Sequence, residues 1–332
     1  MTRTVLKGPA VLLYGGSAAN NTFYTESEIV VDVDFETEAI RNQVYGRVTD
    51  ACMERAVRIT TTPMGVWKGG SAAWAARVAL LWPHLGAVLG SSIFAATAAA
   101  EKTLVVWTKV DGKKYTFHSA GVIKMPSMGL GAKRNLCGAV TWAGLAKLDG
   151  SNNLQNWSVD NSLYSVADAA FSDTNFNQTD ELRTPYTGAW GAVDGFTSIH
   201  TRDGWQIDFD MTTEPDPSDD YGVINYSITD LDFKARCIPL DPTMTQALTS
   251  MKLQGSGAAR GQLLSSIQSN AALVIGGAEV GYPMVTLYKA QLVPAKFQFG
   301  LTTYRNGEFV WKANRYFSAG VGGSLAEIGV TS

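Results

Sequence analysis

The sequence predicts a mainly β protein made of two homologous halves, each a β-sandwich or rolled sheet with one helix packed on it. Three observations lead to this fold class. A long strand pattern has one apolar and one acidic face, the same pattern returns later in the chain, and each half contains one helical segment. The chain has 332 residues, so each half has the size of an ordinary domain.

The first strand pattern lies near the N-terminus. Side chains on successive strand residues point to opposite faces, so alternating residue types give a strand with two different faces. The acidic residues are Glu28, Asp32, Asp34, Glu36 and Glu38, and the apolar residues between them are Ile29, Val31, Val33 and Phe35. Carboxylates on one strand face lie only ~7 Å apart, so they repel one another and need water. We expect a negative, well-hydrated surface here.

The second copy of this pattern has Asp208, Asp210 and Glu214 alternating with Ile207, Phe209 and Met211. The offset is 176 positions (208 − 32), and Pro9, Gly15 and Thr25 recur at it as Pro185, Gly191 and Thr201. This period exceeds the ~20–50 residues of solenoid repeats and matches a whole domain. The sequence therefore predicts an internal duplication, with domains at 1–147 and 185–332.

Each half is expected to follow one order of elements. An extended lead-in ends near Gly15, and the acidic strand, a polar hairpin tip, a return strand, a helix and the closing strands follow. The hairpin tips are expected at 37–43 and 213–220, and the return strands at 45–62 and 221–238. The helices are expected at 71–81, with Ser71 as N-cap, and at 243–253. The closing strands are expected at 103–110, 114–124, 138–142, 273–275, 284–293 and 308–313.

Between the halves, residues 148–184 are rich in Asn, Ser and Asp and form a polar linker. The linker also carries Trp157, Leu163, Tyr164 and Phe171, and apolar side chains of this size are unusual in a chain that floats in solvent. We expect the linker to dock on a surface of the protein.

The composition restricts the class of protein. Only 17% of the residues are charged, which is typical of a chain that hides surface in contacts between subunits, and the net charge of −3 argues against gripping nucleic acid. Cys52, Cys137 and Cys237 form no disulfide framework, and residues 1–5 show no apolar signal segment, so we expect a reducing cytoplasm.

A membrane span is not expected. Residues 78–100 carry no charged side chain, but Pro83 and two glycines interrupt the stretch. The corresponding segment of the second half contains Lys252 and Arg260, and two homologous segments should not differ in whether they cross a bilayer.

Enzymatic and metal-binding interpretations are weak. Asp32 with Asp34, or Asp208 with Asp210, would lie side by side on one strand, whereas a general acid and base flank a cleft. The three histidines and three cysteines lack metal-ligand spacing, residues 255–261 lack a Walker lysine, and the acidic cluster at 216–220 lacks the pattern of a calcium loop. The nine tryptophans leave a carbohydrate-binding β-sandwich as an alternative. We predict no enzyme, metal or cofactor.

The lead-in at 9–14, the long alternating hairpin at 28–62, the helix after it and the closing strands form one pattern. In this pattern each half resembles the tail tube protein of long-tailed bacteriophages. The likeness covers both halves but not the linker at 148–184.

This resemblance implies a ring of six β-rich domains whose long hairpins join into a continuous inner β-barrel. Stacked rings form a hollow tube that guides DNA from the capsid into the host, and a negative lumen lets DNA pass without binding, because like charge denies its phosphates any release of counterions. The implied lumen residues are Asp32, Asp34, Glu36, Asp208 and Asp210. The implied partners are further copies of the chain, other tail proteins and passing DNA, in a virion tail assembled in the bacterial cytoplasm.

The family member usually supplies one tube domain per chain, whereas this chain carries two. We therefore expect three chains to form a homotrimeric ring with approximate sixfold symmetry. The alternative geometry is six chains per ring, with the second domain outside. The alternative function is a ring or tube of another injection or secretion apparatus.

Overall fold

The structure is a computed structural model that describes residues 2–6, 10–15, 22–26, 28–67, 70–94, 102–108, 113–148, 154–160, 184–190, 196, 198–218, 222–240, 262–263, 271–293, 307–315 and 323–331. Within these residues the protein is mainly β, as predicted, with several sheets and the single helix α1 (Gly70–Leu81). The helix begins one residue before the predicted start. The predicted helix at 243–253 lies outside the described residues.

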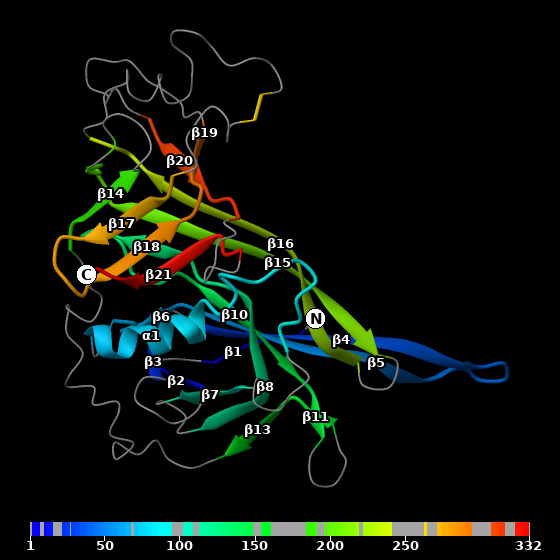
Figure 1. Ribbon diagram of the computed structural model, residues 1–332. Coiled ribbons are helices and arrows are strands. Elements are labelled where there is room, and N and C mark those ends of the chain that lie inside the picture. The colour runs from blue at the N-terminus through cyan, green and yellow to red at the C-terminus, as the bar shows by residue number, and fades with distance from the viewer. Residues whose placement is uncertain are drawn as a thin grey trace.

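The first half forms a ten-stranded antiparallel sheet (Figure 1). Its main path has the order β1-β4-β5-β10-β8-β7-β2-β3-β6, and β13 pairs with β8 beside this path. The strands are β1 (Thr2–Leu6), β2 (Ala10–Tyr14), β3 (Thr22–Thr25), β4 (Ile29–Asn42), β5 (Gly46–Thr61), β6 (Pro63–Met64), β7 (Lys102–Thr108), β8 (Lys114–Lys124), β10 (Val140–Leu145) and β13 (Trp157–Asp160).

The second half is divided between two sheets. One has the order β19-β20-β16-β15-β9 and the other the order β14-β17-β18-β21. The strands are β9 (Met128–Leu130), β14 (Tyr186–Trp190), β15 (Trp205–Ser218), β16 (Gly222–Cys237), β17 (Leu273–Gly277), β18 (Pro283–Leu287), β19 (Gln291–Val293), β20 (Phe309–Lys312) and β21 (Ala326–Val330). A short pair, β11 (Lys147–Leu148) and β12 (Leu154–Gln155), forms a separate sheet.

The expected strand at 284–293 is interrupted in the structure. The described chain turns between β18 and β19, where Lys289 has a φ of 43°. A non-glycine residue in this left-handed region breaks the pleat, so β18 continues one sheet and β19 joins the other. In the first half the corresponding strand β8 is continuous, pairs with both β7 and β10, and keeps the whole sheet together.

Two long hairpins, β4–β5 and β15–β16, dominate the molecule. In both hairpins the first strand has 14 residues and the second has 16. The strands extend beyond the ends expected from the sequence, because residues 37–42 and 213–218 remain paired where polar tips were predicted. The return strands begin at Gly46 and Gly222, whose φ values of 75° and 74° would strain any other residue.

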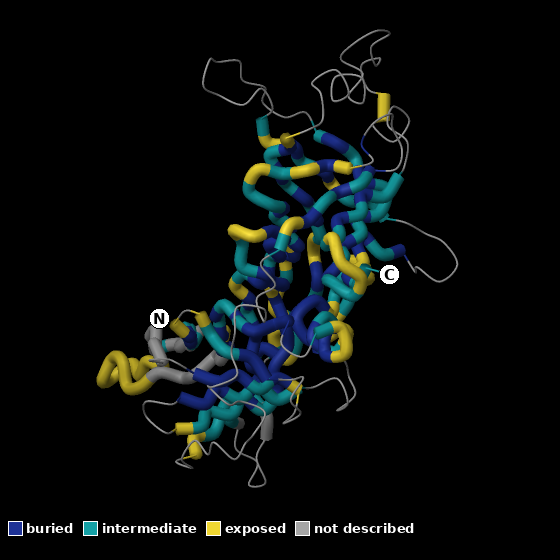
Figure 2. The backbone as a smooth tube through the Cα atoms, turned by 90° about the vertical axis from the view of Figure 1, so that its left-hand side faces the viewer, coloured by how far each residue is buried: buried dark blue, intermediate teal, exposed yellow. Residues whose placement is uncertain are grey.

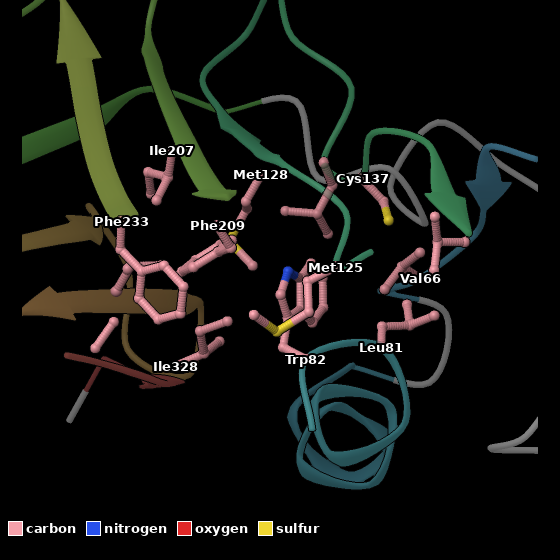
Figure 3. Packing of buried hydrophobic residues seen from close by; sticks show 14 of the residues in the cluster. Val66, Leu81, Trp82, Met125, Met128, Cys137, Ile207, Phe209, Phe233 and Ile328 are labelled. Atoms are coloured by element: carbon pink, nitrogen blue, oxygen red, sulfur yellow. The ribbon is translucent and has the colours of Figure 1, made fainter. Parts of the chain in front are cut away.

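One apolar core runs through both halves (Figure 3). Trp82, just after α1, lies 6.3 Å from Phe209 of the second hairpin between ring centroids, and its indole donates to the carbonyl of Pro126. Trp74 of α1 donates to the carbonyl of Gly329 in β21 at 2.8 Å. The helix of the first half therefore also covers the four-stranded sheet of the second half.

The start of the predicted linker is ordered as a strand. β13 pairs with β8, and Trp157 packs 5.8 Å from Phe117 between ring centroids, in agreement with the expectation that the linker docks. The other apolar linker residues, Leu163, Tyr164 and Phe171, lie outside the described residues. α1, with 12 residues, is too short to cross a bilayer, and the described part of the chain contains no other helix.

Candidate functional site

The two hairpins have the same backbone pairing at a constant offset of 176 positions (208 − 32). Asp32 lies opposite Arg58 in the first hairpin, and Asp208 lies opposite Lys234 in the second. The register shifts between Glu36 and Thr37 and between Ile40 and Arg41, and it shifts again at the equivalent places, Thr212/Thr213 and Asp216/Pro217. Two hairpins of this length therefore share every pair and every bulge.

The cores beneath the hairpins also correspond. Trp142 of β10 lies opposite Ile59, and Trp311 of β20 lies opposite Ala235, which is the position equivalent to Ile59. Both tryptophans are completely buried. Each contacts an aromatic ring on its lead-in strand edge-on, Tyr14 at 5.8 Å and Trp190 at 6.2 Å between centroids.

The apolar faces of the hairpins pack into the core as the alternation predicts. Val31 is buried and Val33 is half-buried against the core, and Ile207, Phe209 and Met211 are all buried. The backbone of Phe35 continues β4, but its side chain lies outside the described part of the structure. The opposite faces carry the charged residues.

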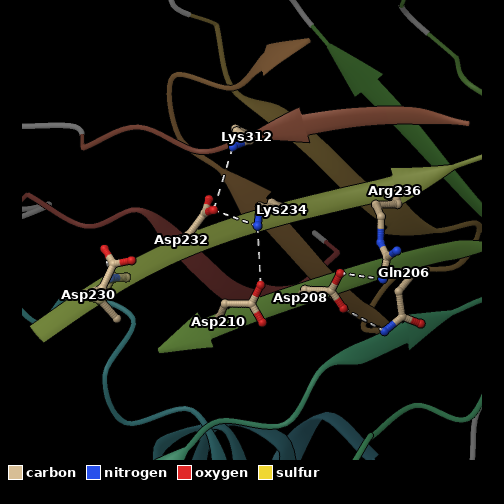
Figure 4. Close-up of polar contacts among 9 residues, drawn as sticks. Gln206, Asp208, Asp210, Asp230, Asp232, Lys234, Arg236 and Lys312 are labelled. Carbon is tan, nitrogen blue, oxygen red and sulfur yellow. Dashed lines mark hydrogen bonds and ion pairs between the residues drawn. The ribbon is translucent and has the colours of Figure 1, made fainter. Parts of the chain in front are cut away.

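On the second hairpin the charged face is a network of ion pairs (Figure 4). Asp208 accepts from Arg236 at 2.8 Å and from the amide of Gln206 at 3.2 Å. Gln206 in turn accepts a hydrogen bond of 3.0 Å from Arg134, which precedes the second half. Asp208 is the less exposed of the two predicted carboxylates on this strand, since 18% of its side chain is accessible, against 61% for Asp210.

Lys234 joins the other carboxylates of this face. Its ammonium lies 2.7 Å from Asp232 and 3.5 Å from Asp210, and Lys312 of β20 approaches Asp232 at 3.8 Å. The hydrogen bond that Lys234 donates to Asp232 raises the pKa of Lys234, so this lysine stays charged. Asp230 is exposed, and its carboxylate accepts from the backbone of Leu231.

The charged face is therefore mixed rather than almost entirely acidic, as the strand pattern alone suggested. Basic residues on the return strand, Lys234 and Arg236, lie between the carboxylates of β15. The sequence contained this signal, because Lys234 and Arg236 alternate along β16 as the carboxylates alternate along β15. In the first hairpin Arg58 occupies the equivalent position opposite Asp32.

The structure places the predicted residues of the first hairpin on one strand. Asp32 is half-buried. Asp34 and Glu36 follow it along β4, opposite Ala56 and Glu54, but the structure does not describe their side chains. The position of these two carboxylates on the charged face thus remains a prediction from the alternation of the strand.

Residues of the first sheet and of the second hairpin line one groove. Arg58 and Lys124 of the first sheet line it together with Asp210 and Thr212 of the second hairpin. Asp208 lies on the same face of β15 as Asp210, and Asp32 lies on the same face of the first hairpin as Arg58. One residue from each charged face, Arg58 and Asp210, therefore borders the same groove.

The described residues contain no group of three or more His, Cys, Asp or Glu side chains close enough to hold a metal ion. His84 faces the carbonyl of Val122, and burial lowers its pKa, whereas His200 lies beside Ser198 on the surface. Cys137 and Cys237 are buried, as expected, and neither forms a disulfide among the described residues; the side chain of Cys52 is not among those described. Asp216 accepts from Asn225 and Ser227.

No model of a protein family matches this chain, and no curated protein sequence matches it.

Proposed function

We propose that this protein is a structural subunit of a phage-type tail tube. Its two homologous domains, 1–147 and 185–332, are joined by the linker at 148–184, and three chains form a ring with approximate sixfold symmetry. The observation that carries this proposal is the equality of the two hairpins in length, register and bulges at one constant offset. Three such chains contribute six equivalent hairpins to one inner barrel.

The edges of the hairpins support closure between copies. β1 covers β4 only from Ile29 to Val33, and β10 covers β5 only from Val57 to Thr61. Beyond these points the two strands pair only with each other among the described residues. No sheet of the described chain closes on itself, and exposed strand edges favour pairing with further chains. A ring of neighbouring copies would cover these edges.

The charged faces support a lumen for DNA. The proposed lining consists of Asp32, Asp34, Glu36, Asp208 and Asp210. The basic groups of the second hairpin, Lys234 and Arg236, are engaged by carboxylates and cannot release counterions from phosphates. DNA that passes through the lumen would therefore meet a hydrated face that does not bind its phosphate backbone.

The recurrence of a charged face in both hairpins favours three chains per ring over six. Arg58, which lies opposite Asp32, lines the same groove as Asp210. A second domain outside the tube would have no use for a charged hairpin face that repeats the face of the first domain.

The test is the mass and shape of the purified protein. Light scattering should give about three times the chain mass of 35.6 kDa for an isolated ring, and negative-stain images should show rings or tubes with a central hole. A protein that remains a monomer at all concentrations and ionic strengths would contradict the proposal. Rings without stacking in the presence of DNA would instead favour a ring of another injection apparatus.

A further inference from the structure

The outer part of the second hairpin is docked inside its own chain. Val223 and Tyr226 of β16 pack in an apolar cluster with residues of the first half, Ala56, Ile123, Ala143, Leu145 and Phe94. Segment 90–94 after α1 holds the same strand through backbone hydrogen bonds, including 2.9 Å from Ile93 N to Tyr226 O. The second hairpin therefore lies across the first sheet on the face that carries Ala56 and Arg58.

The outer part of the first hairpin belongs to no apolar cluster of the described residues. We call residues 40–49 the arm; it projects from the body of the molecule (Figure 1), and all ten of its residues are exposed (Figure 2). Several large apolar side chains lie in the open, with 78% of Val44 and 82% of Tyr45 accessible. A cluster of this kind is typical of a surface that another protein covers.

The matched registers show what each hairpin would touch if both made the same contact. The arm residue equivalent to Val223 is Arg47, and the sheet residue equivalent to Ala56 is Asp232. Val223 and Ala56 belong to one apolar cluster within the chain, and their equivalents are an arginine and an aspartate. The two positions differ in chemistry, but they remain complementary.

We propose that the arm of one copy docks on the charged face of the β15–β16 sheet of a neighbouring copy. This contact repeats between chains the one that the second hairpin makes within a chain, and it rests on the proposed function, since alternating contacts of both kinds close a ring. Arg41 and Arg47 are the only charged residues of the arm. They meet Asp232 and the exposed carboxylate of Asp230, both on the return strand β16.

The difference in chemistry between the two contacts fits their different roles. The contact within the chain is permanent and is made of buried apolar groups. The proposed contact between chains forms after folding, so its surfaces must tolerate water in the free subunit, as charged residues do. Opposite charges also steer the approach of two copies and select the correct face.

Cross-linking tests the contact directly. Two tagged chains, one with Arg47→Cys and the other with Asp232→Cys, are co-expressed and treated with a short bismaleimide. We expect a covalent pair that contains both tags. The matched control replaces Asp232→Cys with Val280→Cys, which is 78% exposed on the turn between β17 and β18 and should give no mixed pair. Wild-type chains measure the background from the natural cysteines.

Charge reversal provides the second measurement. Arg47→Glu alone and Asp232→Arg alone should each raise the protein concentration needed for assembly at least about tenfold, because like charges then face each other across the contact. The two substitutions in one chain should restore assembly. Circular dichroism of the dilute proteins reports whether each variant folds.

The outcomes separate this inference from the proposed function. A mixed pair and rescue by the double variant support the contact. Rings or tubes without the mixed pair, or a pair formed only between two Arg47→Cys chains, overturn the contact and leave the tube intact. A mixed pair without rings supports the contact and contradicts the tube. A wild-type protein that stays monomeric overturns both.

Discussion

The two hairpins have the same backbone pairing but differ in how their outer parts are packed. The second hairpin is docked through Val223 and Tyr226, whereas the first projects with Arg47 at the position equivalent to Val223. Backbone pairing and bulges are identical, so they cannot decide which hairpin docks. A few side chains on the outer third of each hairpin decide this, and the alternation along the inner two thirds sets the register.

The docked tyrosine should give the largest difference between the hairpins. Tyr226 is 1% exposed and lies 6.3 Å from Phe94 between ring centroids. Tyr226→Ala should lower the free energy of unfolding by about 3–5 kcal/mol, because a large buried ring leaves a cavity. Tyr45→Ala on the arm should change it by less than ~0.5 kcal/mol in the monomer. Urea denaturation below the assembly concentration measures both.

Tyr226→Phe is the matched control, since it keeps the ring in the cluster and should retain most of the stability. Equal losses from Tyr226→Ala and Tyr45→Ala would mean that the arm is also packed within its own chain, which would remove the contrast between the two hairpins.

Much of the fold could be predicted because its signals are local and repeated. The alternation of Asp32 and Val33, and of Asp208 and Phe209, identified both hairpins and their buried faces. The strands extend further than the sequence predicts, because Pro215 and Pro217 are residues typical of turns. In the structure both prolines lie within β15, and the bulge between Asp216 and Pro217 accommodates the change of register.

Other features depend on distant partners and left no periodic signal. β9 has only three residues, all buried, and it is defined by pairing with Trp205–Ile207 of β15, far along the chain. The same holds for the docking of Tyr226 against Phe94. At the candidate site the alternation along β15 predicts the carboxylates, whereas their partners Lys234 and Arg236 lie on the return strand β16 and are brought beside them only by the pairing of the hairpin.

Two carboxylates of the charged face, Asp208 and Asp210, should also differ in their contribution to stability, by less than the two tyrosines do. Asp208 is mostly buried and bonds both Arg236 and Gln206, whereas Asp210 is mostly exposed and has one ion pair of 3.5 Å. Asp208→Asn should lower the free energy of unfolding by about 1–3 kcal/mol, because it weakens a charge-assisted contact and leaves Arg236 without its carboxylate. Asp210→Asn should cost less than ~0.5 kcal/mol. Thermal denaturation at neutral pH compares the stability of the two variants. A larger loss for Asp210→Asn than for Asp208→Asn would show that the ion-pair network is centred on Lys234.

The smallest expected effect concerns the position where the hairpins carry different cations, Lys234 and Arg58. The carboxylate of Asp232 raises the pKa of Lys234 above its ordinary value of 10.5. A raised pKa means that the folded protein holds this proton more tightly than the unfolded chain. The resulting stability is complete below pH 10.5 and is lost as the pH rises through the folded pKa.

Lys234→Arg copies the first hairpin, because arginine keeps its charge throughout this range. Denaturant midpoints of both proteins should therefore agree at neutral pH and diverge above pH 10.5, where the wild type should weaken more steeply. Buried tyrosines such as Tyr14 also have a raised pKa, but they are common to both proteins and cancel in the comparison. Parallel curves would show that Lys234 is solvated like an ordinary surface lysine, and the two hairpins would then present equivalent charged faces despite their different cations.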